Sequence, residues 1–181
     1  MPPATLIDST QLNLIINRLC YQLIENHDDF QNTVILGLQP RGIHLAEAIQ
    51  KRLQEIIPGL EIRCGRLDIT FHRDDFRRRE APLSANSTKV DFIIEDQKVI
   101  LVDDVLYTGR TIRSGLDAML SFGRPSIVEL LVLVERRFTR ELPVEPKYIG
   151  KSVDSYDNQQ VKVVFGEGAK DKVLLLTSDI E

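Results

Sequence analysis

Short apolar runs alternate with stretches of helical periodicity along this chain, and this alternation constrains the fold more than any other feature. Three apolar runs rich in β-branched residues have the length of strands: 33–36, 99–102 and 127–134. Apolar residues recur at helical spacing in three further stretches: 8–25, 42–57 and 111–120. Strands that are apolar along their length are typical of a parallel sheet covered on both faces. The pattern predicts an α/β fold with a mostly parallel central sheet flanked by helices.

The rest of the chain carries weaker signals. Shorter strands are indicated at 61–70, near Tyr148, at 161–165 and at 173–176. The stretch from 73 to 96 is polar and contains a proline and two serines, so we expect a long loop that includes a short hairpin. A length of 181 residues fits a single domain covering residues 1–181.

Composition excludes several classes of protein. The chain is 43% hydrophobic and 28% charged, which suits a packed soluble core. It contains neither a run of 18 apolar residues nor a basic and apolar leader, so we expect no membrane span and no secretory signal. The two cysteines, Cys20 and Cys64, lack metal-ligand spacing and indicate reduced thiols in a cytoplasmic protein. A net charge of −4 argues against coating nucleic acid through bulk charge.

The clearest chemical pattern lies at 99–111. Asp103 and Asp104 follow an apolar strand, which we expect to end there, and the segment 108–111 (Thr-Gly-Arg-Thr) opens a helix. Unpaired N–H groups at a helix start bind anions, and Gly109 permits close approach of the backbone. The two carboxylates can accept hydrogen bonds from sugar hydroxyls. Because ligands of parallel sheets bind beyond the carboxyl ends of the strands, this pattern predicts a ribose 5-phosphate site there.

Two other nucleotide sites fit less well. A strand that ends in acids also occurs in nucleoside triphosphatases, but the chain has no G-x-x-x-x-G-K-[ST] motif to hold a triphosphate. No G-x-G-x-x-G follows any predicted strand, so a dinucleotide fold lacks its fingerprint. A second strand-to-helix turn at 38–42 would, taken alone, be an ordinary connection.

Residues 99–111 resemble the phosphoribosyl pyrophosphate signature of type I phosphoribosyltransferases. The sequence of the segment 105–107 (Val-Leu-Tyr) is similar to that of the PyrR family, whose members are bifunctional pyrimidine-operon attenuators and uracil phosphoribosyltransferases. Further fragments follow in the family's order along most of the chain: 40–43, 68–70, 73–75, 123–125, 140–143 and 148–151.

The resemblance implies a type I phosphoribosyltransferase fold with two added features. A mobile catalytic loop would cover about 71–96, and a small hood would be built from the N-terminal and C-terminal segments. The reaction would be Mg²⁺-dependent conversion of uracil and phosphoribosyl pyrophosphate to UMP and pyrophosphate. Mg²⁺ would be bound mainly through the substrate, with Asp103 and Asp104 as the available protein ligands.

The resemblance also implies roles for the motif residues. Asp103 and Asp104 would hold the ribose hydroxyls and favour positive charge on the sugar. The 5-phosphate would be held by Tyr107, Thr108, Gly109, Arg110 and Thr111. The pyrophosphate would meet Pro40, Arg41 and Gly42, and Arg73 from the catalytic loop. Many relatives have a basic residue and a threonine at 39–40, and a proline there supplies no N–H. Arg77, Arg78 and Arg79 are expected to be a solvated run.

Base recognition would use Arg136, Tyr148 and Ile149, with main-chain groups reading the uracil edge. A core position for Tyr148 is an open alternative, since aromatic residues favour strands. Tyr107 stands where the 6-oxopurine enzymes have an aspartate, which favours a pyrimidine base. A phosphoribosyltransferase for another base remains the alternative.

The family's second function is binding of pyrimidine-operon leader mRNA when UMP is bound, by a homodimer or homotetramer with a concave basic surface. Four residues are candidates for that surface: Arg18, Arg137, Arg140 and Lys151. The stretch 136–140 is a residue longer than the common pattern and lacks its Gly-His. This departure counts against RNA recognition more than against catalysis. A nucleotide-sensing, RNA-binding attenuator with little catalysis is a separate alternative.

Overall fold

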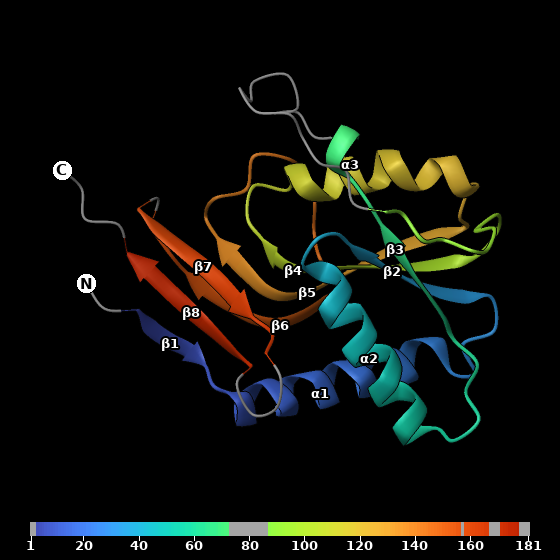
Figure 1. Cartoon of the computed structure of the whole chain (residues 1–181), viewed down its shortest axis with the longest axis horizontal. Helices are drawn as coiled ribbons and strands as arrows, with labels where there is room; N and C mark the ends of the chain where they lie inside the picture. Colours follow the sequence, from blue (N-terminus) through green and yellow to red (C-terminus); the bar gives the residue numbers. More distant parts are fainter. Residues whose placement is uncertain (1–2, 73–86, 157, 167–170, 178–181) are drawn as a thin grey trace.

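The computed structural model describes residues 3–72, 87–156, 158–166 and 171–177, and its centre is a five-stranded parallel sheet (Figure 1). The strand order is β3-β2-β4-β5-β6, and every neighbouring pair is parallel. The strands are β2 (Thr33–Leu38), β3 (Arg63–Leu67), β4 (Lys98–Leu106), β5 (Ile127–Arg137) and β6 (Tyr148–Asp154). The predicted α/β fold with a mostly parallel sheet is confirmed.

Helices cover both faces of this sheet. The helices are α1 (Ser9–His27), α2 (Gly42–Ile56) and α3 (Arg110–Met119), with 3₁₀ turns at Thr70–His72 and Leu120–Phe122. α1 begins at a capping box in which the side chain of Asp8 accepts from the backbone of Gln11 at 2.8 Å. One core cluster joins α1 and α2 to one face of the sheet, and a second joins α3 to the other. Figure 1 shows this three-layer arrangement.

A second, smaller sheet joins the two ends of the described chain. It has the order β1-β8-β7, with β1 (Ala4–Ile7), β7 (Gln159–Val164) and β8 (Lys172–Thr177) all antiparallel. In Figure 1 this sheet lies on the left, beside the carboxyl ends of β4 and β5. The sequence did not indicate β1, because its four residues carry little apolar periodicity and depend on pairing with β8.

Two expected strand boundaries were wrong. The strand that carries the acidic pair does not stop at the acids but continues to Leu106, because Asp103 and Val105 pair with Val132 and Val134 of β5. The strand expected at 61–70 is limited to β3, and residues 70–72 form a 3₁₀ turn.

A buried polar cluster lies at the amino ends of the strands. The Nε2 atom of His27 lies 2.8 Å from Oε2 of Glu129, and the Tyr148 hydroxyl donates to the same oxygen at 2.7 Å. Lys147 Nζ is 2.5 Å from the other Glu129 oxygen, and Thr33 Oγ1 lies 3.3 Å from His27 Nδ1. Tyr148 is 2% exposed. The ring therefore lies in the core, at the opposite end of the sheet from the acidic pair, which favours the core position that the sequence left open. A base-contacting role for the main chain of Tyr148 stays a prediction.

This cluster makes stability depend on pH. Burial lowers the pKa of His27 below its ordinary value of 6.5, despite the nearby Glu129. Burial alone would raise the pKa of Glu129, but hydrogen bonds from Lys147, Tyr148 and His27 outweigh it and lower that pKa. Both shifts give stability that is present above the ordinary pKa and lost as the pH falls below it.

We expect Glu129→Gln to lower the free energy of unfolding by about 1–2 kcal/mol at pH 7, because charge-assisted hydrogen bonds are lost. The difference from wild type should shrink as the pH falls below about 4.5, where Glu129 of the unfolded chain is protonated. Urea unfolding from pH 4 to 7 measures both. Glu145→Gln, at an exposed glutamate, is the control and should match wild type. Unchanged stability of Glu129→Gln at pH 7 would contradict this account.

Candidate active site

Two adjacent carboxylates on β4 form the centre of the candidate site. Asp103 is 6% exposed and Asp104 is 2% exposed. Oδ1 of Asp103 accepts from the backbone N–H of Asp104 at 2.9 Å, and Oδ1 of Asp104 accepts from Val105 at 2.8 Å. Each acid therefore keeps one oxygen for the backbone, which fixes the orientation of its carboxylate.

The turn before α2 meets this acidic pair. Nε of Arg41 lies 3.1 Å from Oδ2 of Asp104, in an ion pair whose geometry leaves that buried oxygen without a directed hydrogen bond. Gly42 packs so closely on β4 that an added Cβ would lie 2.5 Å from the Val102 carbonyl oxygen and 3.2 Å from Asp103 Oδ1. Pro40 follows Gln39 through a cis peptide bond. The structure thus brings the expected pyrophosphate turn and the expected ribose acids together.

Electrostatics make the acidic pair a site for hydrogen-bond donors or positive charge. Burial raises the pKa of Asp103 well above its ordinary value, and the neighbouring charge of Asp104 raises it further. Burial also raises the pKa of Asp104, while the Arg41 guanidinium partly offsets that effect. Two buried carboxylates with one half-exposed cation gain most from sugar hydroxyls, a cationic sugar or a hard cation such as Mg²⁺.

The turn between β4 and α3 places the expected phosphate-binding residues directly beyond the acids. Gly109 precedes α3 with φ of 92°, in the left-handed region that favours glycine. A Cβ there would also lie 3.4 Å from the side chains of Leu142 and Val144. Thr108 and Thr111 are half-buried, and Arg110 is exposed with its Nε 2.6 Å from Glu141 Oε2. This is the helix N-terminus that a phosphate group would approach.

Arg136 lies at the edge of this turn. It is only 5% exposed, and its guanidinium stacks 3.9 Å from the centroid of the Tyr107 ring. Its Nε donates to Ser155 Oγ at 2.7 Å, and its Nη2 donates to the Tyr156 carbonyl at 3.1 Å. The structure therefore joins a residue expected at the base to one expected at the phosphate. Ile149, by contrast, packs against the α3-side core, and its carbonyl accepts from Arg18. Its role toward a base stays a prediction.

The four residues expected at an RNA surface already have partners within the chain. Arg18 donates to the Gly150 carbonyl at 2.5 Å, and Lys151 donates to the Leu6 carbonyl at 3.0 Å. Arg137 pairs with Asp154 at 2.7 Å. These three lie along the edge strand β6 or beside its ends. The fourth, Arg140, points instead to the turn between β4 and α3, where it donates to the Tyr107 carbonyl.

Several expectations lie partly or wholly outside the described residues. Arg73 and the run 77–79 belong to the range 73–86, so their roles stay predictions. Within the described ranges, no group of three or more His, Cys, Asp or Glu side chains is arranged to hold a metal ion. In that same part of the chain, no helix is long and apolar enough to cross a membrane.

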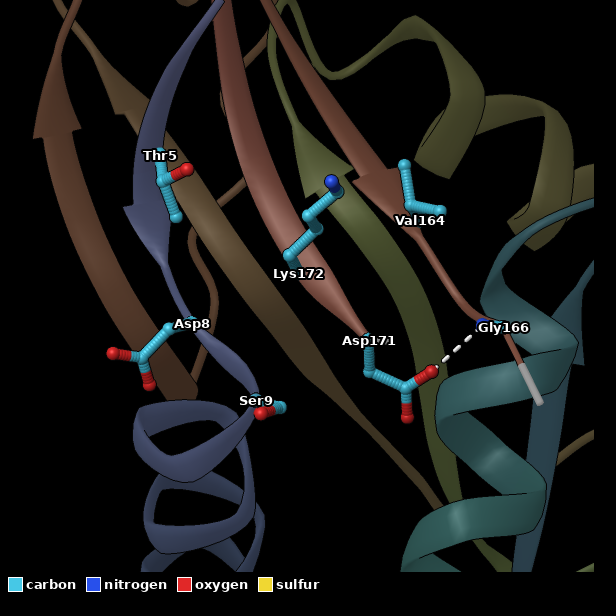
Figure 2. Close-up of a pocket in the computed structure, with 7 residues that line it drawn as sticks. All are labelled: Thr5, Asp8, Ser9, Val164, Gly166, Asp171 and Lys172. Atoms are coloured by element: carbon cyan, nitrogen blue, oxygen red, sulfur yellow. Dashed lines mark hydrogen bonds between the residues drawn. The ribbon is translucent and has the colours of Figure 1, made fainter. Parts of the chain in front are cut away.

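A cavity of about 540 Å³ opens beside the smaller sheet, and Figure 2 shows it between β1, the start of α1 and the ends of β7 and β8. Its lining residues are Thr5, Asp8, Ser9, Val164, Gly166, Asp171 and Lys172. Asp171 accepts from the Gly166 backbone at 2.7 Å within it. None of the described residues expected at the reaction centre lines this cavity.

Comparison with known proteins agrees with this geometry. The family model for the phosphoribosyl transferase domain matches residues 5–169. Bifunctional protein PyrR of Latilactobacillus sakei is 42% identical over 165 residues, covering 89% of this chain and 90% of that protein. The Deinococcus radiodurans protein of the same name is 41% identical over 166 residues, covering 92% and 90%.

Among solved structures, a Trypanosoma cruzi hypoxanthine phosphoribosyltransferase superposes with a TM-score of 0.71, covering 97% of each chain at 12% identity, which establishes the shared fold alone. The chain belongs to the phosphoribosyl transferase domain family, and within it to the bifunctional PyrR proteins.

Proposed function

We propose that the protein is a cytoplasmic uracil phosphoribosyltransferase, which converts uracil and phosphoribosyl pyrophosphate to UMP and pyrophosphate. One observation carries this proposal: the buried pair Asp103 and Asp104 meets Arg41 and Gly42 on one side and runs directly into the turn before α3. A diol, a pyrophosphate and a terminal phosphate are the three groups that such an arrangement would accept.

The proposed reaction breaks the bond from C1 of the ribose to pyrophosphate and forms a bond from C1 to a uracil nitrogen, whose proton is released to water. Asp103 and Asp104 would accept hydrogen bonds from the ribose hydroxyls and stabilise positive charge that develops on the sugar. Arg41 and the backbone at Gly42 would stabilise the departing pyrophosphate. The N-terminus of α3 would hold the 5-phosphate, so the protein acts mainly by positioning and by electrostatics.

Mg²⁺ fits the oxygen-donor set of this site. Among the described residues, the buried Oδ2 of Asp104 has no hydrogen-bond partner and lies 3.1 Å from Arg41 Nε. Asp103 and Asp104 would hold the ion directly or through water, while the substrate supplies most of its ligands. When bound, Mg²⁺ would neutralise charge on the pyrophosphate.

A pyrimidine base is favoured by the environment of Tyr107. Its ring face is covered by the Arg136 guanidinium, and a phenol is a poor proton acceptor near neutral pH. We expect turnover with uracil to exceed that with hypoxanthine, guanine or orotate by at least about a hundredfold in kcat/KM. Faster turnover with a purine would show that the substrate base is a purine, and it would leave the proposed phosphoribosyl site unchanged.

We further propose that the protein regulates pyrimidine genes by UMP-dependent binding to leader mRNA, as a homodimer or homotetramer. This proposal is supported by the word bifunctional in the names of its relatives and by the cations Arg18, Arg137 and Lys151 along the edge strand β6. Because RNA affinity of this kind depends on phosphate contacts, it should fall steeply with salt. An affinity for leader RNA that changes neither with UMP nor with salt concentration would contradict the proposed regulatory function.

The hood and the catalytic loop complete the proposal. We propose one domain of residues 1–181, in which the sheet of β1, β8 and β7 forms the hood. The ring centroids of Phe165 and His44 are 5.6 Å apart, and His44 lies in the first turn of α2. This contact supports the assignment, because it joins the end of β7 to the helix that follows the expected pyrophosphate turn. Arg73, outside the described residues, is proposed to contact pyrophosphate from the catalytic loop.

A further inference from the structure

Arg140 holds the turn before α3 from outside the site. Its Nη1 donates to the carbonyl oxygen of Tyr107, and its Nη2 donates to Oε1 of Glu135 at 3.1 Å. The second oxygen of Glu135 accepts from Ser152 at 3.0 Å. The side chains of Arg140 and Glu135 are 22% and 18% exposed. The guanidinium is therefore fixed between a strand carboxylate and a carbonyl of the turn.

The residues that follow Arg140 hold the next carbonyl of the same turn. The backbone N–H groups of Glu141 and Leu142 both donate to the carbonyl of Thr108, at 3.0 and 3.1 Å. The side chain of Leu142 also packs on Gly109. Residues 140–142 thus form a strap that is bonded to two successive carbonyls of the turn before α3.

Peptide geometry gives these two bonds a consequence on the other side of the turn. In a planar trans peptide, the C=O of one residue and the N–H of the next point in opposite directions. Fixing the Tyr107 carbonyl therefore fixes the Thr108 N–H, and fixing the Thr108 carbonyl fixes the Gly109 N–H. Both N–H groups point away from the strap, at the turn where the helix N-terminus offers its further donors.

We propose that Arg140 is a positioning residue for the 5-phosphate of the substrate, acting through the Tyr107–Thr108 peptide. This inference rests on the proposed function, because it concerns how that same site recognises a phosphate monoester. Arg140 touches no reacting atom. It holds the Thr108 N–H in the direction in which a phosphate oxygen accepts, so its removal leaves that donor free to rotate before the ligand binds. Preorganisation of this kind affects affinity for the phosphate group and leaves the chemical step unchanged.

The test compares ligands that differ only by the phosphate. Affinities for UMP and uridine are measured by calorimetry for wild type, Arg140→Ala and Arg140→Lys. We expect Arg140→Ala to raise the Kd for UMP and the KM for phosphoribosyl pyrophosphate about tenfold, with the Kd for uridine and kcat within about twofold. Arg140→Lys keeps one cationic donor and should recover part of the loss.

Arg52→Ala is the matched control. Arg52 is also partly buried, with a carboxylate partner in Glu55 at 3.0 Å and an amide oxygen partner in Asn17 at 2.5 Å, but it lies on α2 away from the turn. Its UMP affinity should equal that of wild type.

Three results are decisive. A tenfold loss confined to phosphate-bearing ligands supports the positioning role. If Arg140→Ala weakens the affinities for UMP and for uridine equally, the positioning role is overturned. The same holds if neither affinity changes while wild type prefers UMP. Both results leave the proposed function intact. A wild-type protein that binds UMP no better than uridine overturns the proposed function together with this inference.

Discussion

The Asp104→Asn variant is expected to lose at least about a hundredfold in kcat for UMP formation while its free energy of unfolding does not fall. The activity is lost because an amide cannot stabilise positive charge on the ribose or on Mg²⁺. Asn keeps the oxygen that accepts from the Val105 N–H, so the local backbone is retained. Asp117→Asn is the control, since Asp117 is a half-exposed aspartate on α3 that pairs with Arg113 at 3.5 Å.

Stability should move in the opposite direction from activity. Burial raises the pKa of Asp104 and of its neighbour Asp103, so ionising this pair costs stability as the pH rises through their folded-state values. Removing one carboxylate should therefore raise the free energy of unfolding by about 1 kcal/mol at pH 7, measured without Mg²⁺. The gain should vanish as the pH approaches 4. A variant less stable than wild type at pH 7 would contradict this electrostatic account.

The second large effect is expected for Gly42→Ala. An added Cβ would lie 2.5 Å from the Val102 carbonyl oxygen and 3.0 Å from the Cα of Asp103, and backbone atoms of a central strand cannot yield. α2 must then move away from β4, at a cost of about 2–4 kcal/mol in the free energy of unfolding. The KM for phosphoribosyl pyrophosphate should rise at least about tenfold, because Arg41 moves with the helix.

Gly59→Ala separates this clash from backbone strain. Gly59 has φ of 87°, and no atom of the described residues lies within 4 Å of an added Cβ, so the substitution should cost only about 1 kcal/mol and leave KM unchanged. Urea unfolding and initial rates measure both variants. Wild-type stability and KM in Gly42→Ala would show that the turn and β4 are not in the contact described here.

The parallel sheet, and the succession of strands and helices along the chain, could be predicted because the central strands are buried on both faces. Each of β2, β4 and β5 contains at least three consecutive apolar residues, and this signal is local. β1 could not be predicted in the same way. Ala4 and Thr5 of its four residues are exposed, and the segment forms a strand because β8, far away in sequence, pairs with it.

In the candidate site, too, local features could be predicted from the sequence and long-range contacts could not. Residues 103–111 are contiguous, so the acids and the helix start could be predicted from one segment. The strap and the stacking of Arg136 on Tyr107 could not, because they join residues about 30 positions apart through side-chain and backbone bonds. The core position of the Tyr148 ring likewise depends on a residue far away in sequence. Strand propensity placed the ring on β6, but the register with β5 sets it near Glu129, at the amino end of the sheet.

The most direct test of the account is the initial rate of UMP formation from uracil and phosphoribosyl pyrophosphate with Mg²⁺, measured side by side for wild type and Asp104→Asn. We expect uracil-dependent release of pyrophosphate by wild type and a loss of at least about a hundredfold in the variant. Equal rates in the two proteins would show that the reaction does not pass through the Asp103–Asp104 pair. Absence of turnover in a wild-type protein that binds UMP would contradict the enzymatic function and leave a nucleotide-sensing regulator.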